Sequence, residues 1–259
     1  MNPHIAVTRH GAVQVLRINR PEKKNALSGD MYLALVDAIK AGDAAADVAA
    51  HVILGASGAF TAGNDIVDFL AHSTGGGGVG PVLDFIRLLP KVRKPLIAGV
   101  DGFAVGIGTT MLFHCDLVYA SPNATFSTPF LDLGLVPEAG SSLLFPRMMG
   151  YARAFELLAL GGVFTAERAR EAGFVNEVVP SAELEAKVLK AAHRLAAKPP
   201  EALRLARQMM RGDADAVAKR VDEEAEEFAR RLKSPEAREA LSAFLEKRPP
   251  DFSKVLSKA

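Results

Sequence analysis

The alternation of short apolar runs with helical segments, up to about residue 180, constrains the fold most. The runs at 51–56 (HVILGA), 95–102 (PLIAGVDG) and 117–120 (LVYA) consist largely of apolar or small residues. Strands of a parallel sheet have this composition because helices cover both faces of the sheet. The pattern therefore predicts an α/β fold built on a mostly parallel sheet.

The segments around these runs predict the connecting elements. Two β-rich runs at 5–9 and 12–19 predict an N-terminal hairpin. Ser28 has the place of an N-cap, and the helix after it is predicted to end at Gly42. A further helix is predicted over 81–94, with a break at its internal proline.

The character of the chain changes towards the C-terminus. From Ser181 onward nearly every segment has helical periodicity, and Ser234 precedes a proline at the first turn of the last helix. The charge-rich segment 213–248 is predicted to form helices that pack one stripe onto the core or onto a neighbouring subunit. We therefore expect an α/β core over 1–195 and a helical region over 196–259.

Composition and charge exclude several classes of function. The chain has 31 Lys and Arg residues against 30 Asp and Glu residues, so it lacks the basic surplus of a nucleic-acid-binding protein. The single cysteine, Cys115, excludes an internal disulfide and a cysteine-based zinc site, and the histidines lack the spacing of metal ligands. No run reaches the roughly 20 apolar residues that span a bilayer. We expect no metal, no nucleic acid and no membrane partner.

The ends of the sequence bear on location. The N-terminus has no apolar run typical of a signal peptide. The last three residues, 257–259 (SKA), resemble a peroxisomal targeting tripeptide only weakly. A cytoplasmic location is therefore expected.

Two motif-like signals are weak. The segment 106–111 (GIGTTM) begins like a dinucleotide-binding glycine motif, but Met111 stands in place of the third glycine. His114, Cys115 and Asp116 are consecutive, and consecutive side chains of a helix point in different directions. They cannot form a hydrogen-bonded relay, and structural roles are expected for all three.

Two turns rich in small residues follow apolar runs and are more informative. They cover 55–69 and 99–111. Small residues let a ligand approach main-chain N–H groups, and two such groups converging on one oxygen form an oxyanion hole. Spacing alone is equally compatible with tight loops that bind nothing.

The segment 125–150 carries two acidic residues, Asp132 and Glu138, among apolar and small residues. Burial between such neighbours raises the pKa of a carboxyl group above its reference value of about 4.3. A carboxyl group shifted in this way can act as a base near neutral pH. The alternative is that Glu138 caps the helix that follows it.

Five segments together resemble the crotonase superfamily, which has the enoyl-CoA hydratase/isomerase fold. They are 20–28 (RPEKKNALS), 59–66 (AFTAGNDI), 100–108 (VDGFAVGIG), 137–142 (PEAGSS) and 244–252 (FLEKRPPDF), and they occur in the family's order. The resemblance implies a spiral of β-β-α units with a helical C-terminal region that covers coenzyme A and mediates oligomerisation. Homotrimers, often paired into hexamers, are the assembly it implies.

The resemblance also implies a role for individual residues. The main-chain N–H groups of Asn64 and Ile107 would hold a thioester oxygen, the latter near a helix N-terminus. The carboxyl group of Glu138 would be the catalytic base. The coenzyme A part of an acyl-CoA substrate would be contacted by Lys23, Ala26, Ala62, Asp65, Ile66, Phe244 and Lys247. No cofactor beyond that coenzyme A moiety is implied.

Departures from the family pattern narrow the expected reaction. Hydratases of this family use two glutamates, and the corresponding positions here hold Thr110 and Phe130. Glu138 instead matches the single glutamate of the monofunctional, peroxisomal-type Δ3,Δ2-enoyl-CoA isomerases, whose local sequence this chain resembles closely. The resemblance thus implies that a 3-enoyl-CoA double bond moves to the 2-position through a dienolate. Phe130, Leu131 and neighbouring apolar residues would exclude water.

Other functions remain open from the sequence. The same scaffold supports hydration, epoxide or ring isomerisation and thioester hydrolysis, and in such a reaction Asp132 would need a role. Some crotonase-like domains are binding modules without catalysis, which the presence of Glu138 disfavours.

Overall fold

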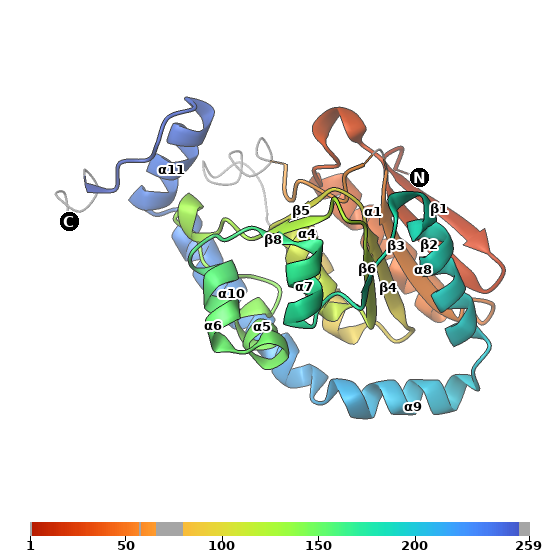
Figure 1. Ribbon diagram of the computed structural model, residues 1–259. Coiled ribbons are helices and arrows are strands. Elements are labelled where there is room, and N and C mark those ends of the chain that lie inside the picture. The colour runs from red at the N-terminus through yellow and green to blue at the C-terminus, as the bar shows by residue number, and fades with distance from the viewer. Residues whose placement is uncertain (1, 57, 66–79, 254–259) are drawn as a thin grey trace.

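The computed structural model describes residues 2–56, 58–65 and 80–253 and centres on a six-stranded sheet (Figure 1). The strand order is β1-β2-β3-β4-β6-β9. Their bounds are β1 Ile5–His10, β2 Val13–Ile18, β3 Ala50–Gly55, β4 Leu96–Val100, β6 Leu117–Ala120 and β9 Glu177–Val178. The β1–β2 hairpin is antiparallel and every other pair in this sheet is parallel. The α/β class, the hairpin and the mostly parallel sheet are confirmed.

Helices cover both faces of this sheet, as the composition of the strands predicts. Helices α1 (Gly29–Ala44) and α3 (Gly80–Leu88) belong to the larger apolar cluster, which includes Leu16, Ile53 and Ala98 from the strands. Helix α8 (Ser181–Ala196) packs on the other face against Val15 and Ile97 (Figure 1). Neighbouring strand residues thus point to opposite apolar layers, so the strands show no polar alternation.

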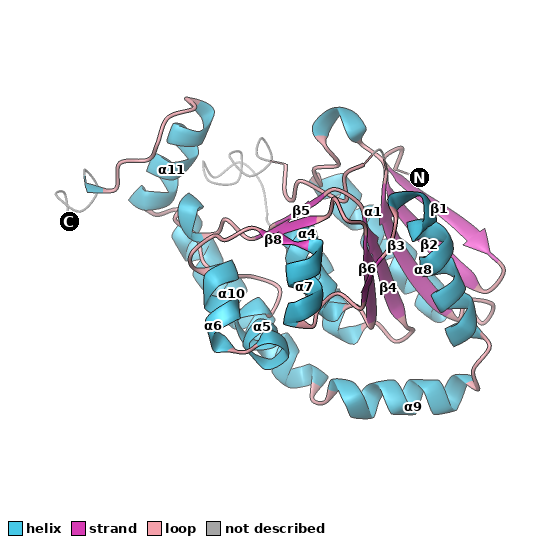
Figure 2. Ribbon diagram, viewed as in Figure 1, coloured by secondary structure: helices cyan, strands magenta, loops and turns pink. Residues whose placement is uncertain are grey.

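A second, three-stranded sheet was not predicted. Its order is β5-β7-β8, with bounds β5 Phe103–Val105, β7 Thr125–Ser127 and β8 Phe164–Thr165 (Figure 2). Strands of two or three residues are too short to show a period of two. This sheet follows from the β-β-α order, because β4 leads into β5 and then α4 (Ile107–Thr110), which continues as a 3-10 turn, η3 (Met111–His114).

The C-terminal part of the chain is helical, as expected. After α8 these helices are α9 Pro200–Arg211, α10 Ala214–Leu232 and α11 Pro235–Leu245. Helices α5 Ser141–Met149, α6 Tyr151–Leu158 and α7 Ala166–Ala172 come earlier, within the region predicted as the α/β core. Helix α9 leads away from α8, and α10 returns to pack against α5 and α3 (Figure 1). Ser234 Oγ accepts a hydrogen bond of 3.1 Å from Ala237 N, which confirms the predicted N-cap. Among the described residues, no helix combines the length and the hydropathy that crossing a bilayer requires.

The predicted end of the first helix is wrong by two residues. Helix α1 continues past Gly42 to Ala44. A Cβ atom at Gly42 would lie 2.5 Å from His51 Cε1 and 2.6 Å from Gln14 Oε1. Gly42 is therefore required for close packing of α1 on the sheet and does not end the helix.

This packing predicts that Gly42→Ala destabilises the protein. His51 and Gln14 are buried and hydrogen-bonded to Asp43 Oδ1 and Ala38 O, so neither can move aside freely. Overpacking of this kind costs about 1–3 kcal/mol, more than the gain in helix propensity of about 1 kcal/mol. Thermal unfolding should give a lower Tm for this variant.

Gly80→Ala is the matched control. Gly80 is the first residue of α3, and no described atom lies within 4 Å of a Cβ built there. The Tm of the Gly80→Ala variant should equal or exceed that of the unmodified protein. Equal Tm values for the Gly42 variant and the unmodified protein would contradict the packing argument.

Candidate active site

The segment 61–65 is held between two other segments by backbone hydrogen bonds. On one side Leu27 N donates to Gly63 O (2.8 Å), and Asp65 N donates to Leu27 O (2.9 Å). On the other side Thr61 forms a parallel bridge with Ala104 of β5. Because Gly63 and Asp65 bond to Leu27, the intervening N–H group of Asn64 points away from it, towards the side of β5.

The bridge to β5 brings the segment of Asn64 next to the segment that leads to Ile107, and these two residues are the pair predicted to bind a thioester oxygen. Thr61 pairs with Ala104, and each partner of the predicted pair lies three residues further along its own chain. Each also follows a glycine with positive φ: Gly63 at 86° and Gly106 at 57°. Among the described residues, neither N–H group has a hydrogen-bond acceptor. Two unpaired donors on adjoining segments can bind one oxygen atom of a ligand when they converge on it.

Asn64 is also held through its side chain. The hydroxyl of Tyr32, on α1, donates a hydrogen bond to Asn64 Oδ1. Tyr32 is buried and its ring centroid lies 5.4 Å from that of Phe85 on α3. This contact is not predictable from the sequence, because Tyr32 has the pattern of an ordinary core residue of an amphipathic helix.

The predicted coenzyme A residues near the N-terminus share one region. Ala26 N donates to Lys23 O (3.0 Å), and Ala62 N donates to Lys24 O (3.1 Å). The side chain of Lys23 is exposed, whereas Ala62 is half-buried. The structure therefore brings the segments around 23–26 and 62–65 together.

Asp65 in this region has a structural contact that sequence analysis did not predict. Arg20 Nη1 donates to Asp65 Oδ2 at 2.7 Å and to Ala26 O at 3.1 Å. Nearby, Asn25 Nδ2 donates to Ala59 O at 2.7 Å. Arg20 and Asn25, which belong to the N-terminal family segment, thus brace the loop that carries Asn64.

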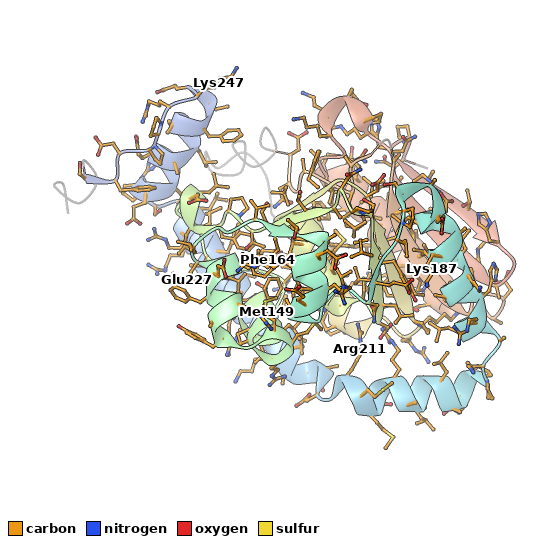
Figure 3. All side chains as sticks on the ribbon, viewed as in Figure 1. Met149, Phe164, Lys187, Arg211, Glu227 and Lys247 are labelled. Atoms are coloured by element: carbon orange, nitrogen blue, oxygen red, sulfur yellow. The ribbon has the colours of Figure 1, made fainter. Side chains whose placement is uncertain are left out.

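The remaining predicted coenzyme A residues do not join this region within one chain. Phe244 is 54% exposed on α11, and Lys247 follows that helix with an exposed side chain. Figure 3 shows Lys247 beyond α11, away from the layer formed by β1 and β2. Ile66 lies outside the described residues.

Of the two acids in the segment 125–150, Glu138 is buried and Asp132 is not. Glu138 is 6% exposed, and its Oε1 accepts a hydrogen bond of 2.5 Å from Thr110 Oγ1, whereas Asp132 is exposed. Desolvation raises the pKa of Glu138 to about 8; the hydrogen bond from Thr110 opposes this shift and the charge of Glu224 adds to it. The carboxyl group can therefore take up and release a proton near neutral pH.

The alternative that Glu138 caps the following helix is wrong. Glu224, on α10, has that role: Gly140 N donates to its Oε2 at 2.6 Å and Ser142 N to its Oε1 at 2.9 Å. A carboxylate already occupies the N-terminus of α5, so the side chain of Glu138 is available to contact Thr110 instead.

The expected structural roles of His114, Cys115 and Asp116 are confirmed. His114 Nε2 donates to Ala139 O at 2.6 Å, and burial lowers the pKa of its imidazole to about 4. Asp116 accepts from Arg207 Nε at 2.8 Å. Burial raises the pKa of the Cys115 thiol to about 12, so the thiol is not an activated nucleophile.

The apolar surroundings of Glu138 differ in part from expectation. Phe130 is buried, with its ring 6.5 Å from that of Phe228 on α10. Leu131 is instead 44% exposed and does not belong to a buried lining.

Within the described part of the chain, no group of three or more His, Cys, Asp or Glu side chains is arranged to hold a metal ion.

Comparison with known proteins identifies relatives over nearly the whole chain. The family model described as enoyl-CoA hydratase/isomerase matches residues 8–255. The chain is 36% identical to enoyl-CoA delta isomerase 2 of Rattus norvegicus over 251 residues, which cover 95% of this chain. They cover 64% of that relative, so the chain spans less than two thirds of its length.

Relatives with a different named activity are also similar. The chain is 32% identical to 2,3-dehydroadipyl-CoA hydratase of Escherichia coli, over 96% of this chain and 98% of that protein. A crystal structure of an enoyl-CoA hydratase/isomerase from Pseudoalteromonas atlantica matches with a TM-score of 0.91 and 38% identity, over 96% of this chain and 99% of the other. The comparisons thus contain both isomerases and hydratases.

The burial of Glu138 predicts a pH-dependent stability effect of Glu138→Gln. The pKa is about 8 in the folded state against 4.5 for the free side chain, so the unfolded chain loses this proton first as the pH rises. Stability is therefore lost between these two pH values. A neutral glutamine avoids this loss, and we expect its Tm to exceed that of the unmodified protein by roughly 5 °C at pH 9.

Calorimetry at pH 5 and pH 9 measures this effect. The advantage of the glutamine variant should be small at the lower pH and large at the higher one. A Tm difference that is the same at both values would show that Glu138 is not buried as an acid with a raised pKa.

Proposed function

The chain belongs to the enoyl-CoA hydratase/isomerase family, whose members act on acyl-CoA thioesters, and we propose that it moves a 3-enoyl-CoA double bond to the 2-position. The supporting observation is the buried carboxyl group of Glu138, which accepts a hydrogen bond from Thr110. By the family resemblance, Thr110 and Phe130 stand where hydratases have their two glutamates. A double-bond shift needs one group that removes and returns a proton, whereas hydration also needs an activated water molecule.

In the proposed reaction Glu138 transfers the proton, and the N–H groups of Asn64 and Ile107 hold the thioester oxygen. The Glu138 carboxylate removes a proton from C2 of the substrate, which the thioester and the adjacent double bond make acidic. The electron pair moves into a dienolate whose oxygen accepts hydrogen bonds from Asn64 N and Ile107 N. Protonated Glu138 then delivers the same proton to C4. Loss of one such N–H donor typically costs about 10²–10³ in rate.

The raised pKa of Glu138 suits this cycle. A carboxyl group with a pKa of about 8 holds a proton firmly enough to keep it between its removal from C2 and its delivery to C4. The hydroxyl of Thr110 donates a hydrogen bond to this carboxyl group. Threonine, unlike a glutamate at the same position, has no carboxylate that could activate a water molecule. Isomerisation is therefore favoured over hydration.

The coenzyme A moiety is proposed to bind at the region around Lys23, Ala26, Ala62 and Asp65, with Ile66. We propose that Phe244 and Lys247 complete a site on a neighbouring subunit, because α11 carries them away from this region within one chain (Figure 3). The helical segment 196–259 would then serve both coenzyme A binding and assembly. No metal or separate cofactor enters the proposed reaction.

An NMR assay of 3-enoyl-CoA and 2-enoyl-CoA in deuterated water tests the proposed reaction. The unmodified protein should interconvert the two thioesters without forming a 3-hydroxyacyl product. Glu138→Gln should lower kcat by about 10²–10⁴, because the proton carrier is absent.

Asp132→Asn is the matched control, because Asp132 is the exposed acid of the same segment and should leave turnover unchanged. Unchanged turnover in the Glu138 variant would refute the assignment of the base. A hydrated, epoxide-derived or hydrolysed product would instead identify one of the other acyl-CoA reactions. Failure of the protein to bind any acyl-CoA would favour a non-catalytic binding module.

A homotrimer or a dimer of trimers is the proposed assembly, and apolar exposure supports it. Tyr151 and Phe155 on α6 are 72% and 54% exposed, and Leu160 just beyond the helix is 73% exposed. Light scattering should give a mass of three or six chains, and Phe155→Glu should lower it. A monomeric mass for the unmodified protein would contradict the proposal that Lys247 acts across subunits.

A further inference from the structure

A second buried acid lies close to Glu138 and comes from a distant part of the sequence. Glu224, on α10, is 7% exposed. It accepts hydrogen bonds from Gly140 N (2.6 Å), Ser142 N (2.9 Å) and Ser142 Oγ (2.5 Å). These donors belong to the start of α5, two to four residues after Glu138. Carboxylate contacts at a helix N-terminus are favourable because the first N–H groups of a helix have no acceptor within it.

The turn between Glu138 and α5 requires such support. Ala139 has φ of 57° and Gly140 has φ of 74°, so both are in the left-handed region. For alanine this conformation costs roughly 1–2 kcal/mol. It persists because His114 bonds Ala139 O from one side and Glu224 bonds Gly140 N from the other. The direction of the Glu138 side chain depends on this turn.

We infer that Glu224 is a positioning residue, which clamps the first turn of α5 and thereby fixes the Glu138 carboxyl group beside Thr110. This inference rests on the proposed role of Glu138 as the proton carrier. Glu224 itself is not proposed to touch the substrate, because three donors from α5 and its N-terminal residue occupy its two oxygens.

The charge of Glu224 contributes a second effect. It favours the protonated form of Glu138, the form that must persist between the two proton transfers. Burial raises the pKa of Glu224, whereas hydrogen bonds from Ser142 and Gly140 and the charge of Arg220 lower it. Glu224 is thus a buried acid whose charged form is supported by several donors.

The other titratable and charged groups around Glu138 and the start of α5 are Tyr32, His114, Arg211 and Arg220. Tyr32, on α1, feels the charge of Glu138, and burial keeps its pKa well above the usual range. His114 has a pKa of about 4 and is neutral. Arg211 contacts His114 O, and Arg220 Nη1 donates to Ser142 Oγ at 3.1 Å.

Kinetics of Glu224→Gln test the inference. Glutamine has a similar size, but it lacks the charge and directs an amide N–H group towards an N–H or O–H donor of α5. We expect kcat to fall about 10- to 100-fold, with KM nearly unchanged because the coenzyme A region lies elsewhere. The rising limb of kcat/KM against pH should move to lower pH.

Ser142→Ala separates the clamp from the charge. It removes one of the three donors to Glu224 and leaves the carboxylate in place. We expect kcat to fall about threefold, with a pH limb that does not move to lower pH. Should the Glu224 variant fail to fold, an unchanged kcat for Ser142→Ala would overturn the inference, and the expected decrease would support it.

A direct titration makes the result independent of catalysis. The carboxyl signal of Glu138 is followed by ¹³C NMR in ligand-free protein labelled at glutamate, and it is assigned by its absence in Glu138→Gln. In Glu224→Gln this signal should titrate at lower pH. Near-UV circular dichroism and Tm confirm that each variant is folded.

The outcomes distinguish the two proposals. If the unmodified protein does not isomerise 3-enoyl-CoA but the Glu138 titration moves in the Glu224 variant, the proposed function fails and the effect of Glu224 on Glu138 stands. If the unmodified protein isomerises the substrate and neither Glu224→Gln nor Ser142→Ala lowers kcat, the positioning role is overturned. A loss of kcat in a folded Glu224→Gln variant, with the titration of Glu138 unchanged, would support the clamp and contradict the effect of the charge.

Discussion

The burial of one carboxyl group, Glu138, is the constraint on which the site depends. Desolvation raises its pKa to about 8, and the surrounding structure has to tolerate an acid that is 6% exposed. Thr110 supplies one hydrogen bond, and the left-handed turn at Ala139 holds the side chain in place. A more exposed carboxyl group would ionise at a lower pH and would bind a transferred proton less firmly.

The donors for a ligand oxygen depend on a different physical constraint, the pairing of backbone segments. The bridge between Thr61 and Ala104 brings the segments of Asn64 and Ile107 next to each other, and a glycine of positive φ precedes each of the two. The loop that carries Asn64 is braced by Arg20, which pairs with Asp65 at 2.7 Å. Backbone donors held in this way need little reorganisation when a negative charge develops on a bound oxygen.

Stability and the proposed chemistry are in conflict at this site. A buried acid with a raised pKa lowers the stability of the folded state as the pH rises. Gly42 illustrates the opposite case, in which close packing of α1 against His51 serves stability alone. The contacts of Glu224 reduce the conflict, because they stabilise the N-terminus of α5 while they hold the turn that carries Glu138.

Local sequence alone determined the parallel sheet and the N-cap at Ser234, because apolar runs and capping residues act over a few positions. It also indicated that Glu138 is buried, since its neighbours are apolar or small. The family resemblance pointed to Asn64 and Ile107. Only the tertiary structure decided that Glu224 clamps α5 and that Tyr32 bonds Asn64. These contacts join residues far apart in the chain, and helical periodicity places a side chain on a face without specifying its partner.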